Sequence, residues 1–312
     1  MPIGTPFQAR TDPLCTSRNW RPWSGHFVAG SYGDFVQPEY AAIRHSAALI
    51  DVSPLYKYAV EGPQAAELVD RVITQAAARM QSGQVVYTPW CDADGKVRQE
   101  GTVFRHFDGS FQLNAAEPAL GWLELNATGL DARIRDRSSR IAALSLQGPL
   151  SRDVLRAAGV AGIEDLRFFR LIDAEIDETP IRVSRTGYTG DLGFEIWLPA
   201  GAAVRIWDAL MQAGEPWHIT PCGLAAMDIA RLETGFILIN VDYVSAEIAR
   251  LEADKVSPYE IGLGWTVQLD KGPFIGRAAL AALAKRPAPR SIAGLVVDWE
   301  PLEKIHLDAD LM

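Results

Sequence analysis

The amino-acid sequence predicts an α+β fold in which antiparallel sheets are mixed with flanking helices. Asp-Gly pairs at 94–95 and 108–109 lie between extended segments, and Asp-Gly favours a tight hairpin turn because both central residues need positive φ. Two alternating segments, 58–63 and 144–149, end at Gly-Pro and lead into amphipathic stretches. Proline suits the first turn of a helix, so these segments predict two strand–helix units beside a β-meander.

The elements of the first half follow in order. Residues 1–38 are rich in Gly, Pro, Ser and aromatic side chains, which indicates a packed but irregular arm. Helical spacing covers 39–50. The first Gly-Pro unit predicts a strand that ends at Val60 and a helix over 64–73. Three strands, joined by the Asp-Gly turns, are expected over 85–91, 97–107 and 110–115.

The second half contains the other strand–helix unit, with a strand over 144–147 and a helix over 150–157. A third hairpin is expected from strands over 181–185 and 194–198. Two more helices are expected over 201–213 and 221–235. Gly235 is expected to end the last helix, since glycine readily adopts the left-handed backbone found there. Prolines and basic residues mark a linker near 285–291, and a further strand is expected over 292–297.

The composition excludes several classes of protein. With 312 residues, 48% hydrophobic and 22% charged, the chain can bury a core and is not of the disordered type. Its net charge of −9 argues against a nucleic-acid backbone as partner, and no apolar run has the roughly 18 residues of a membrane helix. The three cysteines are far apart and no secretory signal is recognisable, so we expect a cytoplasmic protein. The five histidines are scattered, so no metal site is expected.

One acidic residue lies inside an otherwise apolar strand. Glu195 stands between Phe194 and Ile196, directly after the glycine-rich loop 186–193, whose glycines allow close backbone approach. A buried acid is costly unless it faces solvent or meets a partner. The residues leave two alternatives, an exposed glutamate of a tight hairpin or a carboxylate that accepts paired N–H donors from a heterocyclic ligand.

Two other polar groups are candidates on weaker grounds. The run 98–101 interrupts an alternating strand, and it is either an exposed strand face or a site in which Glu100 acts as general acid or base. In the helix over 221–235, Asp228 and Arg231 are three residues apart and can pair on one face. A structural ion pair is the better interpretation of that spacing.

Short motifs that follow one another along the chain connect it to a family; they are Ala48–Ser53, Asn114–Ala116, Leu146–Pro149, Tyr188–Ile196, Pro221–Gly235, Gly262–Trp265 and Phe274–Arg277. In this order and spacing they resemble the glycine cleavage T-protein family, from about residue 40 to 297. The resemblance implies a tetrahydrofolate-dependent one-carbon transferase. It also implies a ring of three domains around a central folate site, the last of them a C-terminal β-barrel.

The same resemblance implies a division of the chain into three parts. These are a folate-binding core domain over 1–53 and 140–284, an inserted α+β domain with the β-meander over 54–139, and a linker with the start of a truncated barrel over 285–312. Residue by residue, Glu195 matches the family glutamate that holds the pterin ring. The other residues matched to the folate site are Tyr188, Tyr87, Asn114, Trp265 and Arg231.

The chain departs from the family at three places. The family's Asp-Asp pair reads Gln99-Glu100; Gln99 cannot ionise, and Glu100 is expected on the opposite face because side chains alternate along a strand. Amine-transferring members have Ser-His-Met after Asp-Val, whereas this chain has the segment Ser53–Tyr58, which contains Tyr56. Met227 stands where the family has an arginine. The catalytic candidates are therefore Glu100, Gln99 and Tyr56.

The loss of the first acid at Gln99 favours a demethylase branch of the family, because such branches also lack that acid. The prediction is a folate-dependent methyl or methylene transferase that acts on a small-molecule methyl donor, in which proximity and orientation supply much of the rate. Two alternatives remain open. One is the aminomethyltransferase of glycine cleavage, with a lipoyl carrier protein as partner, and the other is a folate-binding protein without catalytic activity.

Overall fold

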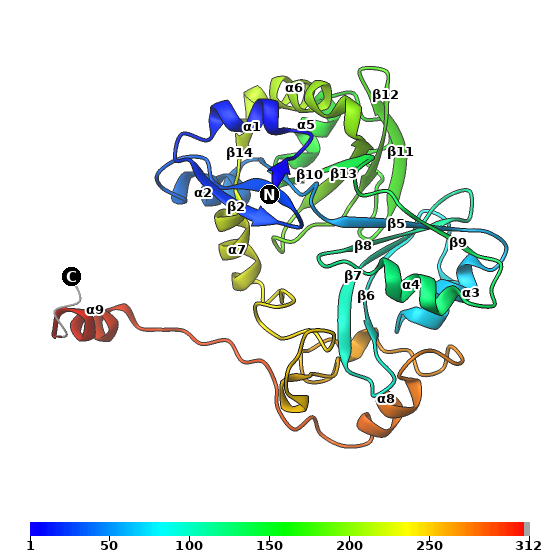
Figure 1. Ribbon diagram of the computed structural model, residues 1–312. Coiled ribbons are helices and arrows are strands. Elements are labelled where there is room, and N and C mark those ends of the chain that lie inside the picture. Colours follow the sequence, from blue (N-terminus) through cyan, green and yellow to red (C-terminus); the bar gives the residue numbers. More distant parts are fainter. Residues whose placement is uncertain (309–312) are drawn as a thin grey trace.

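The larger of the two main sheets has six strands. The computed structural model describes residues 1–308 and places these strands in the order β11-β12-β13-β10-β4-β14 (Figure 1). Their bounds are β4 (Ala48–Asp51), β10 (Ile141–Gln147), β11 (Leu171–Ile176), β12 (Thr179–Ser184), β13 (Gly193–Pro199) and β14 (Thr220–Pro221). All neighbours are antiparallel except β4 and β14. The predicted third hairpin is β12–β13, and its strands are as expected.

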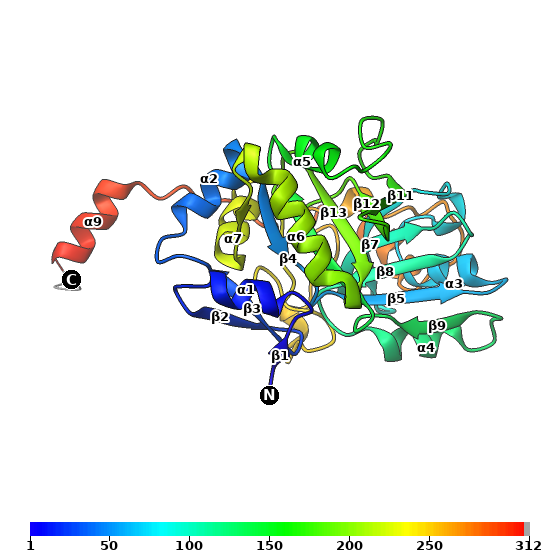
Figure 2. The ribbon, with the colours of Figure 1, turned by 90° about the horizontal axis from the view of Figure 1, so that it is seen from above.

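Helices cover both faces of this sheet. On one face α1 (Gln8–Leu14), α5 (Ser151–Ala157) and α6 (Ala203–Gly214) lie over a core that includes Leu144, Ile196 and Trp207. Figure 2 shows α6 lying beside β13 and running roughly along it. On the other side, α2 (Gln37–His45) and α7 (Leu224–Glu233) contribute Ile43 and Ala226 to a second core. The amphipathic pattern of the sequence thus correctly predicted helices α5, α6 and α7.

The second main sheet has five strands in the order β6-β7-β8-β5-β9. Their bounds are β5 (Tyr56–Glu61), β6 (Val85–Cys91), β7 (Val97–Arg105), β8 (Phe111–Ala115) and β9 (Arg133–Asp136). Two helices, α3 (Ala65–Val72) and α4 (Leu120–Ala127), pack on one face with Leu68, Val103 and Leu123 in the core. Both Asp-Gly hairpins are confirmed, but the expected turn with positive φ at both residues is not, because Gly95 and Gly109 have positive φ and Asp94 and Asp108 do not.

The N-terminal arm is more regular than the sequence predicted. It contains α1 and a three-stranded sheet of β1 (Ile3–Gly4), β2 (Asn19–Trp23) and β3 (His26–Ser31). The turn between β2 and β3 has positive φ at Ser24 and Gly25. Ser-Gly is a weaker hairpin signal than Asp-Gly, which is why the pattern was not recognised.

Two other predicted elements were wrong. The helical pattern over 39–50 contains both α2 and β4, because a short apolar run does not distinguish a buried strand from a helix. The strand expected over 292–297 is absent, and this segment has no regular secondary structure. A strand needs a neighbouring strand whose backbone groups pair with its own N–H and C=O groups. Within 292–297, the described structure has one backbone hydrogen bond, from the N–H of Ile292 to the Glu260 carbonyl.

The C-terminal part is formed of short helices and loops. Helix α8 (Arg277–Leu283) packs beside the β6–β7 turn, where Leu280 lies close to Gly95. Helix α9 (Trp299–Asp308) follows an extended segment that leads away from the rest of the molecule (Figure 1). The 3-10 helices are η1 (Ala77–Arg79), η2 (Ala200–Ala202), η3 (Glu215–Trp217), η4 (Glu252–Asp254) and η5 (Gly264–Thr266).

The predicted α+β class with antiparallel sheets and flanking helices is confirmed. The five-stranded sheet uses only residues between 56 and 136, whereas the six-stranded sheet uses 48–51 and residues from 141 onward. The domain bounds themselves stay a prediction. Among residues 1–308 no helix has both the length and the apolar character that crossing a membrane requires.

The two main sheets meet through aromatic side chains. Phe104 of β7 packs edge-on against Trp197 of β13, with ring centroids 5.2 Å apart and planes at 88°. Val85 and Ile50 belong to the same buried cluster. Since side chains alternate along a strand, every second residue of β7 and β13 faces this junction. The junction between the sheets is therefore where residues from both sheets can form one site.

Gly101 on β7 is expected to be intolerant of substitution. A Cβ at this position would lie 1.9 Å from the carbonyl oxygen of Asn114 on β8. We expect Gly101→Ala to lower the free energy of unfolding by about 1–3 kcal/mol or more, because the strands must separate locally. Urea unfolding measures this change. In Gly121→Ala, the control on α4, the Cβ meets nothing within 4 Å and stability should not fall. Equal stability of both variants would contradict the tight β7–β8 contact.

Candidate functional site

Three predicted site residues share the face of the five-stranded sheet that meets the larger sheet. In the strand register Tyr87 lies opposite Thr102, and Thr102 lies opposite Asn114. Residues opposite each other in a ladder share a face, and Glu100 is two positions from Thr102. Tyr87, Glu100 and Asn114 therefore lie on the same face as Phe104, which contacts the other sheet.

Gln99 lies on the other face of the sheet. Its side-chain amide donates to the Glu117 carbonyl at 3.0 Å, and its Oε1 accepts from the backbone N–H of Glu100 at 3.2 Å. Glu100 and Gln99 thus point to opposite faces, as expected. However, Glu100 is the one that shares the face of Tyr87 and Asn114, so the ionisable member of the pair is directed to the junction.

Glu100 is a buried carboxyl without a cationic partner. It is 8% exposed, and within residues 1–308 no Lys, Arg or His nitrogen lies within 4.0 Å of its carboxylate. Burial raises the pKa of Glu100 to about 7, against the opposing effects of the Tyr87 hydroxyl and the Ile239 backbone. A carboxyl that titrates near neutral pH is suited to exchange protons with a reacting group.

Tyr188 approaches the same region from the glycine-rich loop. Its hydroxyl donates to the Ile237 carbonyl, and its ring stacks on Phe236 with centroids 5.8 Å apart. Burial and the nearby charge of Glu100 both raise the pKa of Tyr188. The loop thereby attaches to the segment that follows α7, beside Glu100.

Glu195 lies on β13 on the face of Trp197, directed to the sheet junction. It is partly exposed, and the Thr186 hydroxyl donates to its Oε2 at 2.5 Å. Burial raises the pKa of Glu195, and the Thr186 hydroxyl opposes this effect. No other hydrogen bond reaches the Glu195 side chain from the described residues, so Oε1 can accept from a ligand.

The glycines of the loop serve the protein itself rather than a ligand. A Cβ on Gly187 or Gly193 would lie 2.2 or 2.0 Å from Oε1 of the buried Gln147 side chain. A Cβ on Gly190 would lie 1.9 Å from the Thr234 side chain. The close approach that the sequence predicted is therefore between parts of this chain. Gln147 also accepts from Thr189 at 2.9 Å, which holds the loop in place.

Asn114 is buried and oriented by its neighbours. Its amide donates to the Thr102 hydroxyl at 3.1 Å, and its carbonyl accepts from Gln112 at 2.8 Å. The structure therefore brings Tyr87, Glu100 and Asn114 together, with Glu195 and Tyr188 on the elements that face them.

Two further predicted residues, Tyr56 and Trp265, lie away from Glu100 and Glu195. Tyr56 pairs with Ala115 on the helix-covered face of the five-stranded sheet and stacks on Tyr58. This position corrects the expectation that Tyr56 shares the site of Glu100, because alternation along β5 turns its ring away. Trp265 is 66% exposed in η5, and no contact in the described chain connects it with Glu195.

Arg231 forms ion pairs and a hydrogen bond with other residues of this chain. Its guanidinium lies 2.7 Å from Asp228 and 2.5 Å from Asp242, and it donates to the Phe236 carbonyl at 3.0 Å. Its side chain is 3% exposed. The structural ion pair anticipated from the helix spacing is present, and the role of Arg231 in ligand binding stays a prediction.

Two residues near the junction were missed by the sequence analysis. Lys57 is fully buried on the Asn114 face, where its ammonium donates to the carbonyls of Ser53 and Leu55 at 2.6 and 2.7 Å. Burial lowers the pKa of Lys57 to about 7, against the charge of Asp51. Strand alternation between Tyr56 and Tyr58 could have placed it. The other residue is Tyr243, which is 6% exposed and whose pKa is raised by burial and by the charge of Glu100. No periodic signal in the sequence marks Tyr243.

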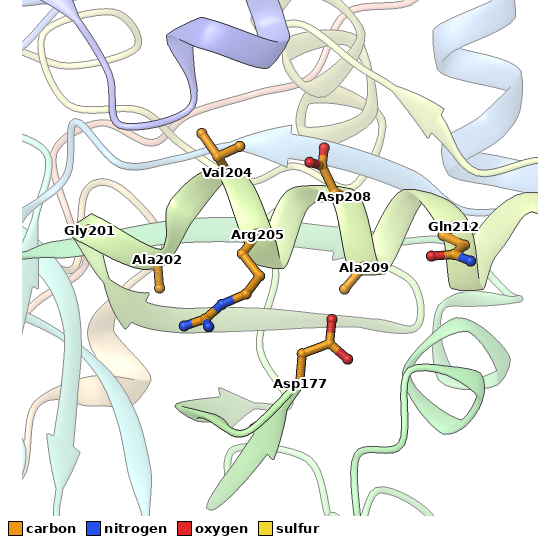
Figure 3. Close-up of a pocket in the computed structure, with 8 residues that line it drawn as sticks. All are labelled: Asp177, Gly201, Ala202, Val204, Arg205, Asp208, Ala209 and Gln212. Carbon is orange, nitrogen blue, oxygen red and sulfur yellow. The ribbon is translucent and has the colours of Figure 1, made fainter.

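Surface hollows lie away from these residues. One hollow is formed by α6 and the β11–β12 turn, where Asp177 lies opposite Arg205 (Figure 3). Another lies beside Glu61 and α4. None of the predicted site residues lines either of them. The candidate site is therefore not defined by either hollow. It is defined by two carboxyls on the faces where the two sheets meet, Glu100 and Glu195.

Comparison with known proteins gives consistent matches. The family model described as GCVT N-terminal domain matches residues 18–271. The aminomethyltransferase of Halothermothrix orenii is 34% identical over 260 residues, covering 82% of this chain and 70% of that protein. The aminomethyltransferase of Streptomyces coelicolor is 34% identical over 268 residues, covering 83% and 70%. The crystal structure of the glycine cleavage system aminomethyltransferase T from Bartonella henselae superposes with a TM-score of 0.81 at 27% identity, covering 92% of this chain and 76% of that one.

Proposed function

The chain belongs to the GCVT N-terminal domain family, and from this premise we propose that it is a tetrahydrofolate-dependent aminomethyltransferase. The observation that carries the proposal is the position of Glu100. Relatives with 34% identity are named aminomethyltransferases, and Glu100 supplies an ionisable group on the face of Tyr87 and Asn114. The demethylase interpretation was preferred because Gln99 cannot ionise. Since Gln99 lies on the other face, that argument loses its basis.

The residues present fit a reduced folate. Glu195 has a free carboxylate oxygen and no cationic partner in the described chain, so it can accept the paired N–H groups of a pterin ring. Tyr87 and Asn114, on the face of the five-stranded sheet that meets the larger sheet, and Tyr188 would offer ring surface and amide groups. Tetrahydrofolate, when bound, supplies the nitrogen atoms that accept the one-carbon unit. Glu195 would hold the ring, and the sheet junction would keep water from it.

Glu100 would exchange the proton. In aminomethyl transfer the donor's nitrogen must leave as ammonia, so it must gain a proton when its bond to carbon breaks. The Glu100 carboxyl, which is partly protonated at neutral pH, can give that proton and recover it from solvent. A lipoyl-bearing carrier protein is the partner proposed for this reaction, and a small-molecule donor is the alternative.

Replacing Glu195 tests the binding half of the proposal. Glu195→Ala is expected to weaken tetrahydrofolate binding by about 1.5–3 kcal/mol, the usual range for hydrogen bonds to a charged group. Isothermal titration calorimetry measures this change. Glu175→Ala is the matched control, because Glu175 is an exposed acid of the same sheet. Equal affinities in both variants would contradict the role of Glu195.

The reaction itself is tested with an aminomethyl-loaded lipoyl carrier protein and tetrahydrofolate. Release of ammonia together with methylene-tetrahydrofolate is the expected result. Formation of methyl-tetrahydrofolate from small methylated donors alone would instead favour the demethylase interpretation. Tight folate binding without turnover of any donor would show a binding protein.

A further inference from the structure

Glu195 is flanked by serines on both neighbouring strands. In the strand register it lies opposite Ser184 of β12 and Ser145 of β10, so the three side chains share one face of the six-stranded sheet. The Ser145 hydroxyl accepts from the Gln147 amide at 2.9 Å, and within residues 1–308 it makes no bond to the carboxylate. The hydrogen bonding of Glu195 within the protein therefore comes from the side of β12.

A chain of hydrogen bonds leads from Trp197 to this carboxylate. The Trp197 indole N–H donates to the Ser184 hydroxyl oxygen at 3.2 Å, and the hydroxyl oxygens of Ser184 and Thr186 are 2.8 Å apart. The Thr186 hydroxyl oxygen lies 2.5 Å from Oε2 of Glu195. The side chains of Trp197, Ser184 and Thr186 are all buried, so solvent does not compete for these bonds.

The chain of hydrogen bonds has a single direction. An indole N–H can only donate, so the Ser184 oxygen accepts from Trp197. An ionised carboxylate can only accept, so the Thr186 proton points to Glu195. Thr186 then has no proton left for Ser184, and the Ser184 hydroxyl must donate to Thr186. Every proton of the chain is thus turned toward the Glu195 carboxylate, which favours its ionised form.

No charged side chain competes with Thr186 for this carboxylate among the described residues. Burial and the Thr186 hydroxyl act in opposite directions on the pKa of Glu195. The charged side chain that comes next along this face of β12 is Arg182, which pairs with Asp173 at 2.6 Å and contacts His106. Thr186 is therefore the neighbour that orients the carboxylate, and it leaves Oε1 free.

We propose that Ser184 and Thr186 are positioning residues for folate binding, because their one-way chain of hydrogen bonds holds the ionised Glu195 carboxylate with Oε1 directed to the ligand's N–H groups. Both residues act through Glu195 rather than by contact with the ligand. The inference rests on the proposed function, since it takes Glu195 as the residue that holds the pterin ring. Trp197, at the start of the chain, also forms the aromatic contact with Phe104 that joins the two sheets.

A double-mutant cycle tests this role, with tetrahydrofolate binding to the full chain measured by isothermal titration calorimetry. Thr186→Val keeps the shape of the side chain and removes its hydroxyl. We expect it to weaken binding about tenfold, the scale of a hydrogen bond to a charged group. Thr186→Ser keeps the hydroxyl and should bind within about twofold of wild type. In the Glu195→Ala background, Thr186→Val should change the affinity by less than about twofold, because the carboxylate through which it acts is gone.

Thr179→Val is the matched control. Thr179 is 2% exposed on the same strand, and its hydroxyl donates to the Asp177 carbonyl at 3.3 Å, so its loss should leave folate affinity unchanged. Ser184→Ala is a second test variant. It should weaken binding less than Thr186→Val does, because Thr186 still reaches the carboxylate. Melting temperatures show which variants are folded, and Ser184→Ala with its own Glu195→Ala cycle decides the question if Thr186→Val is not.

The outcomes separate the inference from the proposed function. Equal effects of Thr186→Val with and without the Glu195 carboxylate would overturn the inference, since Thr186 would then act only by holding its loop. Thr186→Ser that binds as weakly as Thr186→Val would assign the effect to the methyl group and overturn it as well. If Glu195→Ala weakens binding but neither Thr186→Val nor Ser184→Ala does, the positioning role is wrong and the folate-dependent function stands. If wild type does not bind tetrahydrofolate, the proposed function fails and this inference fails with it.

Discussion

Glu100→Gln is expected to reduce turnover by about 10²- to 10⁴-fold, the range for loss of a general acid or base, and at the same time to stabilise the protein. Glutamine keeps the size of the side chain but cannot give or take a proton. The pH profile of kcat/KM for wild type should show an inflection near the pKa of about 7 that Glu100 has in the folded protein. That inflection should be absent from the variant.

The gain in stability has a defined dependence on pH. The folded-state pKa of Glu100, about 7, lies above the ordinary value of 4.5, so the unfolded chain loses this proton first as the pH rises. Wild type therefore loses stability progressively between about pH 4 and pH 7. Glutamine does not titrate, so Glu100→Gln should exceed wild type by on the order of 3 kcal/mol at pH 8 and show no such advantage at pH 4.

Urea unfolding at pH 4 and pH 8, with steady-state kinetics on the same samples, checks both parts. Glu124→Gln on α4 is the control, because this side chain is exposed and should alter neither quantity. A variant of Glu100 that keeps full turnover, or that is less stable than wild type at pH 8, would refute the assignment of Glu100 as a buried proton-exchanging group.

Arg231→Met is expected to cost about 1.5–3 kcal/mol of unfolding free energy, because it removes the hydrogen bonds that a buried guanidinium donates to the carboxylates of Asp228 and Asp242. Arg231 joins α7 to the segment that follows it, through Asp242 and the Phe236 carbonyl. That segment accepts the Tyr188 hydroxyl at Ile237, so its release should also loosen the candidate site.

Arg156→Met provides a matched comparison. Arg156 likewise contacts two carboxylates, Asp153 and Glu164, but its side chain is 54% exposed. An exposed pair contributes little to stability, so this variant should unfold almost as wild type does. Urea titration of both proteins measures the difference. A stable Arg231→Met protein with tenfold weaker folate binding would show instead that Arg231 contacts the ligand.

The sequence by itself determined the fold class, the family and the alternation within each strand. Asp-Gly turns specify hairpins locally, and the period of two along β7 correctly predicted that Gln99 and Glu100 point to opposite faces. These features depend on neighbouring residues, so they can be recognised without the rest of the chain. The same locality explains why a short apolar run, 47–50, was confused with the helix before it.

Only the tertiary structure decided which face of the five-stranded sheet carries the candidate site. Alternation gives two faces but does not say which one meets the other sheet, and the contact of Phe104 with Trp197 resolves this in favour of Glu100 over Gln99. Tyr243 joins Glu100 through bonds between segments about 150 residues apart, such as Ser245 with Arg98, which no local pattern encodes. Burial of a carboxyl, and with it a raised pKa, is likewise a property of packing, because it depends on what the folded chain places around the group.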